Sequence, residues 1–556
     1  MRRIAGVISA LIGLAALLIG AAAQTTHPIR EPASRPAQKT PASNPGQSAD
    51  TIKTFRQVFG DLLGKETPAA PLPQTKAPGE RVVEETFFEL SMFNMPVGRM
   101  CAQDIKVRDQ GRERDGARMA IDITMLRMGQ KSAISVQDFE VYDESGQLSH
   151  FTTDMRLSGV VNSTEGRVEN GQCHMVMLDG ATGEKSERTM PWDPEVVSEG
   201  QMQKDFKDLV HGPVGGKKVH KVFMPEQMLT QSQVAVTTST LRGVETRETA
   251  FGSKELYRIE VLMDLGIALP TSAWVDGDGE LYEQETVLGP IKMVARRITG
   301  TEPARPASAM PPEIFEPTTL KIAKPIAKPE TTRHAIYRLK FNEGKAPGIY
   351  EDDGQRSLGV EGDTLRLEVT SRKPDRPFPM SEIRVPPNGE AYLQPSTFVQ
   401  SDDEEIRSAA RKAIGEETDA WKRAKLLEKW VNGYVRQKDL GMAFASAKET
   451  MKTRQGDCTE HATLLAALCR AVGIPARAAE GLVYARSIGG FGYHMWTQVY
   501  LDGWYNLDAT RPQPDAADAT HIAYGSSALD APLGGDLALQ IIKFFGQFQI
   551  DVEKAE

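Results

Sequence analysis

The chain has little cysteine: four residues in 556, with no C-x-x-C pair among them. Four cysteines are too few for a disulfide scaffold or a cysteine-rich zinc protein in a chain of this length. The nine histidines form no H-E-x-x-H pair, which removes the commonest helical zinc motif. We therefore predict neither a metal site nor a cofactor, and each cysteine needs its own explanation.

An excess of basic charge is also missing. Lysine and arginine number 66 against 75 aspartates and glutamates, which gives a net charge of −9. Broad binding to nucleic acid or anionic lipid needs clustered positive charge, so nucleic acid is not an expected partner. Hydrophobic residues make up 40% and charged residues 25%, which is the composition of globular domains.

The one long uncharged apolar run lies at the N-terminus. Arg2 and Arg3 precede an apolar stretch over residues 4–19, and three alanines at 21–23 follow before Gln24. This layout is typical of a secretory signal peptide over residues 1–23. The chain is then exported, to the periplasm or the extracellular space. The alternative is an uncleaved anchor, since residues 4–23 are just long enough to span a bilayer, and only then would the chain have a membrane tether.

Composition divides the remainder into segments. Residues 24–78 form a Pro-rich tether with one short amphipathic helix around Ile52–Leu63, and residues 82–300 alternate with period two, as antiparallel strands do. Residues 301–330 are a second Pro-rich linker, 331–400 a small strand-rich segment, and 401–556 a helix-rich catalytic domain. The predicted fold class is multidomain α+β.

Two features of the predicted β domain need a decision. Asp276-Gly-Asp-Gly279 resembles a calcium loop, but Leu281 and Val287 occupy positions where an EF-hand needs glycine and glutamate. We predict a hairpin turn there. Cys101 and Cys173 lie on strand-like segments, and export would allow a disulfide between them, although two buried thiols fit the spacing equally well.

Capping patterns locate the helices of the C-terminal region. Ser401–Glu404 and Ser446–Glu449 have the form of capping boxes, and between them residues 417–436 have helical periodicity. A third box pairs Asp457 with Glu460 and begins a helix that runs from Cys458 to about Val472.

This register makes Cys458 the first helical residue. A thiol at the positive end of a helix dipole is expected to have a pKa below the free value of about 8.5, which favours the nucleophilic thiolate. Alone, Cys458 would more commonly be a buried apolar residue. Cys469, later on the same helix, lies among Leu465, Leu468 and Val472, and we assign it to the core.

A strand at 494–501, a turn at Asp502-Gly503 and a returning strand to Asp508 follow a Gly-rich loop at 487–493. Three residues now supply the parts of a thiol acyl-transfer site: Cys458 a nucleophile, His494 a base, and Asp508 a group that orients the base.

Gly456-Asp-Cys-Thr-Glu-His-Ala462, His494-Met-Trp-Thr-Gln-Val499 and Asp508-Ala-Thr510 resemble the three signature blocks of the transglutaminase-like superfamily, in the same order. The resemblance covers about Gln394 to the C-terminus. It implies a papain-like α+β core with Cys458 as nucleophile, His494 as base and acid, and Asp508 orienting His494. Ala509 stands where proline is commoner. The calcium sites and barrel domains of the animal enzymes are not recognisable, which leaves hydrolysis and transamidation both open.

The resemblance implies an exported thiol enzyme that acts on a peptide or protein amide of the cell envelope through an acyl-enzyme. Tyr493 and Trp496 are candidates to line the substrate cleft, although Trp496 fits the core of the hairpin equally well. The alternative function is a catalytically silent binding or assembly module of the envelope, built on a papain-like core. His461 is a rival base because it lies three residues after Cys458 on one helix, but we favour a structural role for it, since a base needs its own orienting group.

The triad places a condition on the hairpin. A two-residue turn would pair Leu501 with Trp504 and point Asp508 away from His494. A three-residue turn with Gly503 in a left-handed bulge pairs Tyr500 with Trp504 instead, and puts His494 and Asp508 on one face as diagonal neighbours. We therefore predict the three-residue turn.

Overall fold

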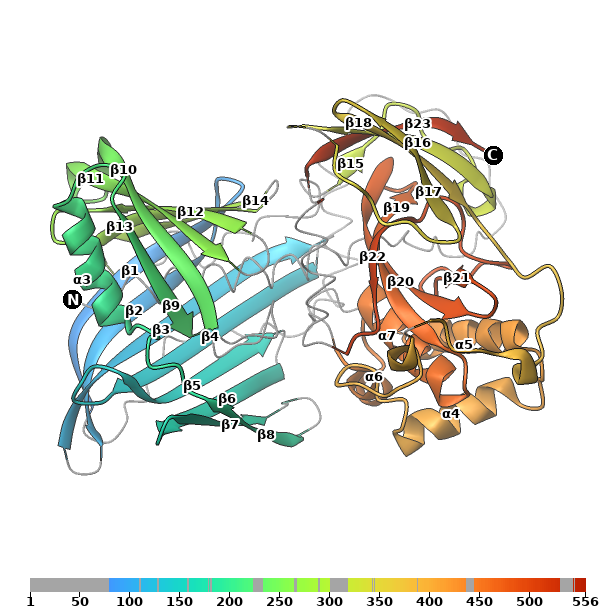
Figure 1. The fold of residues 1–556 in the computed structure, drawn as a ribbon, viewed down its shortest axis with the longest axis horizontal. Helices are drawn as coiled ribbons and strands as arrows, with labels where there is room; N and C mark the ends of the chain where they lie inside the picture. The colour runs from blue at the N-terminus through green and yellow to red at the C-terminus, as the bar shows by residue number, and fades with distance from the viewer. Residues whose placement is uncertain are drawn as a thin grey trace, which may run out of the picture.

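The computed structural model describes residues 80–109, 112–127, 130–157, 160–178, 180, 183–223, 234–264, 268–288, 291–300, 319–342, 344, 346–387, 389–436, 445–530, 544 and 546–556. The predicted signal peptide, the tether with its amphipathic helix, and most of the second linker lie outside these residues. Figure 1 shows an N-terminal lobe built on one large sheet and a C-terminal lobe that combines helices with smaller sheets. Among the described residues, no helix is long and apolar enough to cross a bilayer.

The N-terminal lobe confirms the prediction of an antiparallel sheet. Its fourteen described strands follow the order β8-β7-β6-β5-β4-β3-β2-β1-β14-β13-β12-β11-β10-β9, so that most sequence neighbours are also neighbours in space. The strands are β1 (Arg81–Met92), β2 (Met95–Asp109), β3 (Arg112–Arg127), β4 (Gln130–Tyr142), β5 (Leu148–Leu157), β6 (Val160–Glu169), β7 (Gln172–Leu178), β8 (Lys185–Pro191), β9 (Lys217–Phe223), β10 (Val234–Thr249), β11 (Gly252–Asp264), β12 (Ala268–Val275), β13 (Leu281–Leu288) and β14 (Ile291–Ile298).

Alternation of side chains gives this sheet one apolar face. On β11, for example, Ile259, Val261 and Met263 are fully buried at every second position, as the period of a strand requires. Helix α3 (Glu199–Val210) covers this face with an apolar stripe that includes Met202 and Phe206. The curved sheet and α3 are seen together in Figure 1.

Both open questions about the β domain are answered. The Asp276 segment is a hairpin turn between β12 and β13, because the Asp276 carboxylate accepts hydrogen bonds from the backbone N–H groups of Asp278 and Glu280. Cys101 on β2 and Cys173 on β7 are buried thiols that no disulfide joins.

Part of the predicted linker is a strand. Strand β15 (Leu320–Lys321) pairs with β20 (Gly490–Tyr500) of the C-terminal lobe, and the short 3-10 helix η2 (Pro329–Thr331) follows. The close approach explains Gly490, since a Cβ atom there would lie 2.4 Å from the Leu320 carbonyl oxygen.

The strand-rich segment forms a four-stranded sheet in the order β17-β18-β16-β23. Strands β16 (His334–Phe341), β17 (Gln355–Glu361) and β18 (Thr364–Thr370) come from this segment, whereas β23 (Phe548–Ala555) comes from the end of the chain. Tyr337 of β16 is fully buried and its hydroxyl donates to the Ala519 carbonyl. This sheet therefore packs, within the C-terminal lobe, against the part that holds the predicted catalytic residues.

The helices begin near the predicted caps, with one correction. They are α4 (Glu404–Ile414), α5 (Ala420–Tyr434), α6 (Ala447–Thr453) and α7 (Cys458–Ala471), and the short 3-10 helices η3 (Met380–Glu382) and η4 (Glu390–Tyr392) precede them. Ser446 and Glu449 form the predicted capping box of α6. The prediction of Ser401 as a cap is wrong, because the Asp403 carboxylate accepts from the N–H groups of Glu405 and Ile406 instead.

A second sheet carries the C-terminal hairpin, in the order β15-β20-β19-β22 with β21 paired to β20. Its remaining strands are β19 (Ala476–Ala485), β21 (Trp504–Leu507) and β22 (Ile522–Ser527). One face of β19 and β20, with Ala478, Met495 and Val499, shares a hydrophobic core with α7. His494 and Trp496 alternate onto the opposite face.

Candidate active site

The start of α7 is held by the predicted capping box. Asp457 accepts a hydrogen bond from Thr459 N–H, and the Glu460 carboxylate accepts from Asp457 N–H at 2.8 Å. Gly456 makes this possible, because its φ is +149° and a Cβ atom there would lie 2.3 Å from the Cβ of Glu460. Cys458 is the first residue of α7, as predicted, and is 1% exposed.

The thiol of Cys458 lies beside β20. The backbone N–H of Met495, the residue after His494, donates a hydrogen bond to it. Burial, followed by the charge of Asp457, nevertheless holds the pKa of the Cys458 thiol well above its usual range. The prediction of an acidic thiol is therefore wrong for the resting protein. Burial and the nearby carboxylates outweigh the effect that was expected from the helix start.

The hairpin has the register that the triad required. Tyr500 pairs with Trp504 and Thr497 with Leu507, so Asp508 and His494 lie on the same face. The predicted left-handed Gly503 is wrong, since Gly503 is not among the residues of positive φ. The space beside Gly503 is limited instead. A Cβ atom would lie 3.0 Å from the Asp353 carboxylate, which accepts from Trp504 N–H at 2.7 Å.

His494 and Asp508 are in direct contact. The Nε2 of His494 donates to Oδ2 of Asp508 at 2.9 Å, and both side chains are buried. The backbone N–H of Asp508 donates at 3.0 Å to Glu428 on α5, and the other carboxylate oxygen accepts from Thr510 N–H at 2.9 Å. Glu428 thus holds the backbone of Asp508 and Thr510 holds its carboxylate. The fixed carboxylate in turn orients the imidazole of His494.

The charges of this pair are set by their surroundings. The pKa of Asp508 lies well below its usual range, despite burial, because two histidines donate to it. Burial lowers the pKa of His494, and the positive charges of His521 and Arg511 lower it further, against the opposing effect of Asp508. The resting pair is therefore a carboxylate and a neutral imidazole at neutral pH.

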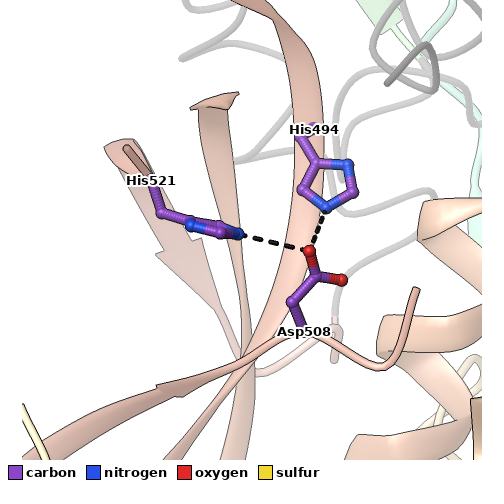
Figure 2. Close-up of side chains that lie close together, drawn as sticks. All are labelled: His494, Asp508 and His521. Carbon is purple, nitrogen blue, oxygen red and sulfur yellow. Dashed lines mark hydrogen bonds and ion pairs between the residues drawn. The ribbon is translucent and has the colours of Figure 1, made fainter. Parts of the chain in front are cut away.

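His521 is a site residue that the sequence reasoning missed. It directly precedes β22, and its Nε2 lies 3.2 Å from the same Oδ2 of Asp508. Figure 2 shows His494 and His521 approaching this carboxylate oxygen from two sides. A lone histidine before Ile522-Ala523 gave no signal, because its contact depends on the path of the chain between Asp508 and β22.

His494, Asp508 and His521 are also the one cluster among the described residues that could hold a metal ion, with ligand atoms within 4.8 Å of one another. The guanidinium of Arg511 lies 3.6 Å from the shared oxygen. A fixed positive charge at that distance disfavours a divalent cation, so the cluster fits hydrogen bonding better than metal binding.

Three further candidates have structural surroundings. His461 turns back on its own helix, where its Nδ1 contacts the Asp457 carbonyl. Tyr493 is 1% exposed, shares a core with Tyr524, and accepts from Gly546 N–H. Trp496 is 1% exposed and donates through Nε1 to Asn506 at 2.9 Å. Trp496 packs with Ala479 and Ala523, which fits the hairpin-core alternative.

A family model described as the transglutaminase-like superfamily matches residues 407–509. The match contains Cys458, His494 and Asp508 and ends before His521. Residues 407–509 are a transglutaminase-like domain. The predicted family and the papain-like core are therefore confirmed for this part of the chain.

Solved structures resemble larger portions of the chain only weakly. A "putative cysteine protease" of Cytophaga hutchinsonii is 19% identical, with a TM-score of 0.26, over 35% of this chain and 82% of its own. A β-barrel-like protein of Brucella abortus with a domain of unknown function is 11% identical, with a TM-score of 0.30, over 39% and 95%. These similarities are too low to assign an activity to the transglutaminase-like domain, and no curated protein matches the chain.

Proposed function

We propose that the transglutaminase-like domain catalyses thiol-dependent acyl transfer from an amide, with Cys458, His494 and Asp508 as its catalytic triad. The observation that carries the proposal is the 2.9 Å bond between His494 Nε2 and the Asp508 carboxylate. It lies beside a cysteine at a helix start whose thiol accepts the Met495 N–H. A nucleophile, a base and a group that orients the base are the parts that thiol-dependent acyl transfer uses.

The charge states define the first step. Because the resting thiol is protonated and the imidazole neutral, His494 acts as a general base and not as one half of a preformed ion pair. Its Nε2 is engaged by Asp508, so Nδ1 receives the proton from Sγ as the sulfur attacks the amide carbon. Backbone N–H groups at the start of α7 stabilise the oxyanion.

The second step releases an amine. The C–N bond breaks as His494 returns its proton to the leaving nitrogen, which leaves a thioester on Cys458. Water then attacks the thioester to give an acid, or a second amine attacks to give a new amide. We propose a peptide or protein of the cell envelope as substrate, because the N-terminal residues have the layout of an export signal.

A second candidate function is a catalytically silent binding module. Two observations favour it. Cys458, His494 and Asp508 are each 1% exposed. A fourteen-stranded sheet also accounts for much of the described chain. The two functions differ in whether Cys458 forms a thioester.

Trapping the acyl-enzyme tests the proposal. The full chain is incubated with peptides from cell-envelope extract, quenched in acid and digested, and the Cys458 peptide is examined by mass spectrometry. We expect an added acyl mass in the wild type and also in Cys469→Ala. This variant is the matched control, because it removes the other buried thiol of α7. The mass should be absent from His494→Ala. An unmodified Cys458 across extracts, in a folded chain, would favour the binding module.

A further inference from the structure

The imidazole of His521 lies between two carboxylate-bearing residues and is fully buried. Its Nδ1 is 3.0 Å from the backbone carbonyl oxygen of Asp518 and 3.2 Å from the Asp518 carboxylate. Its Nε2 is 3.2 Å from Oδ2 of Asp508. The side chain thus spans the gap between the proposed catalytic carboxylate and a second carboxylate.

These contacts define the protonation state of His521. A carbonyl oxygen can only accept, so Nδ1 carries a hydrogen. The Asp508 carboxylate is ionised and also accepts, so Nε2 carries a second hydrogen. An imidazole with hydrogens on both nitrogens is an imidazolium cation.

The groups around His521 balance this charge. Asp508 and Asp518 are the two anions, and the guanidinium of Arg511 lies 3.6 Å from the first and 4.0 Å from the second. The centroid of the His494 ring, on β20, lies 5.9 Å from that of His521, and Tyr337 on β16 approaches Asp518. The two carboxylates raise the pKa of His521 to about 9, so two anions face two cations in the interior.

We propose that His521 is a positioning residue, an imidazolium at neutral pH that holds the Asp508 carboxylate ionised and directed at His494. This inference rests on the proposed function of the triad. It adds His521 to the triad as a fourth residue, which lies beyond the end of the family match. Through their contacts with His521 and Asp508, Asp518 and Arg511 also affect the charge of His494.

The arrangement has a specific electrostatic consequence. Asp508 alone would stabilise the protonated form of His494 strongly, which would make it a poor base at neutral pH. Sharing one oxygen between His494 and a cation weakens that effect, since burial and then the positive charge of His521 lower the pKa of His494. His494 therefore stays neutral and able to accept the Cys458 proton, while Asp508 still orients it.

Nuclear magnetic resonance of the full chain with isotope-labelled histidine tests this directly. We expect both ring nitrogens of His521 to show the protonated imidazolium signature at pH 7 and to titrate near pH 9. In His521→Gln, the titration midpoint of His494 should rise, because a nearby positive charge is gone. A purely structural histidine would leave that midpoint unchanged.

Two further variants complete the experiment. Asp518→Asn removes one carboxylate from His521 and should lower the midpoint of His521. This variant also keeps the test valid if His521→Gln does not fold. His220→Gln is the matched control, since His220 is a buried histidine 2.9 Å from Asp205 in the N-terminal lobe, and it should leave His494 unchanged.

A neutral His521 at pH 7 in the wild type would overturn the inference, whatever the activity. So would an unchanged His494 midpoint in folded His521→Gln. If the imidazolium is present but Cys458 forms no acyl-enzyme, the proposed function fails while the charge arrangement stands, so the two failures are distinguishable.

Discussion

At the residue scale, burial sets the charges of two groups in the C-terminal site, and hydrogen bonds between charged neighbours set the others. Burial holds the Cys458 thiol protonated and the His494 imidazole neutral, whereas hydrogen bonds from two histidines keep Asp508 ionised. The sequence places these residue types correctly but gives no measure of burial. An acidic thiol was therefore a reasonable prediction from the helix start and an incorrect one for the folded chain.

Glu480 on β19 shows the same effect at a position with no assigned role. It is 1% exposed, lies opposite Met495, and neither carboxyl oxygen has a hydrogen-bond partner among the described residues. Burial raises its pKa well above the ordinary value. Because the folded pKa is raised, the stability contribution is complete below the unfolded pKa and is lost as pH rises toward the folded one.

We predict that Glu480→Met stabilises the protein at pH 7 by about 1–3 kcal/mol, the cost of a buried polar group without partners. The advantage over wild type should grow from pH 5 to pH 8. Thermal denaturation across that range measures it, and Glu144→Gln, at an exposed position, is the control. A destabilised variant at pH 7 would show that Glu480 has a partner that the described residues do not supply.

At the element scale, the α7 start and the β20–β21 hairpin do most to build the site. Both could be predicted, the α7 start because caps follow from local sequence and the hairpin because the triad places a condition on it. The register of the hairpin followed from requiring Asp508 to meet His494, and it is confirmed. The contact of His521 with Asp508 could not be predicted, since it depends on a loop with no periodicity. The pairing of β23 with β16 joins residues about two hundred positions apart, and no local pattern signals it.

Gly456 provides a test of the α7 start. We predict that Gly456→Ala destabilises the protein by about 1–3 kcal/mol, because φ is +149° and the added Cβ meets Glu460. Loss of the capping geometry would also displace Cys458. Gly433→Ala is the matched control: Gly433 lies in α5 with nothing within 4 Å of an added Cβ, so alanine should be neutral or stabilising. Equal melting temperatures for the two variants would contradict this account of the capping box.

At the scale of the whole molecule, the end of the chain is part of the lobe that holds the site. Strand β23 pairs with β16, and its side chains alternate between the core and solvent. Composition predicts a separate segment at residues 331–400. The structure instead closes that sheet with the C-terminal strand and ties it to the loop before β22 through Tyr337.

Adjacent residues of β23 offer a matched pair of substitutions. Ile550 is 3% exposed and lies in the hydrophobic core, whereas Asp551 points to solvent. We predict that Ile550→Ala costs about 2–5 kcal/mol, and that Asp551→Ala changes stability by less than about 0.5 kcal/mol. Chemical denaturation of the full chain distinguishes them. A negligible effect of Ile550→Ala would show that β23 is dispensable for the lobe.

The most direct measurement of the central claim is covalent labelling of the intact chain by a peptidyl epoxide, read by mass spectrometry at the Cys458 peptide. Wild type and Cys469→Ala should label at Cys458 at equal rates. His494→Ala should label at least about 100-fold more slowly, since general-base assistance contributes about 10²–10⁴-fold. Labelling of Cys458 at the wild-type rate in folded His494→Ala would contradict the assignment of His494 as the base that activates this thiol.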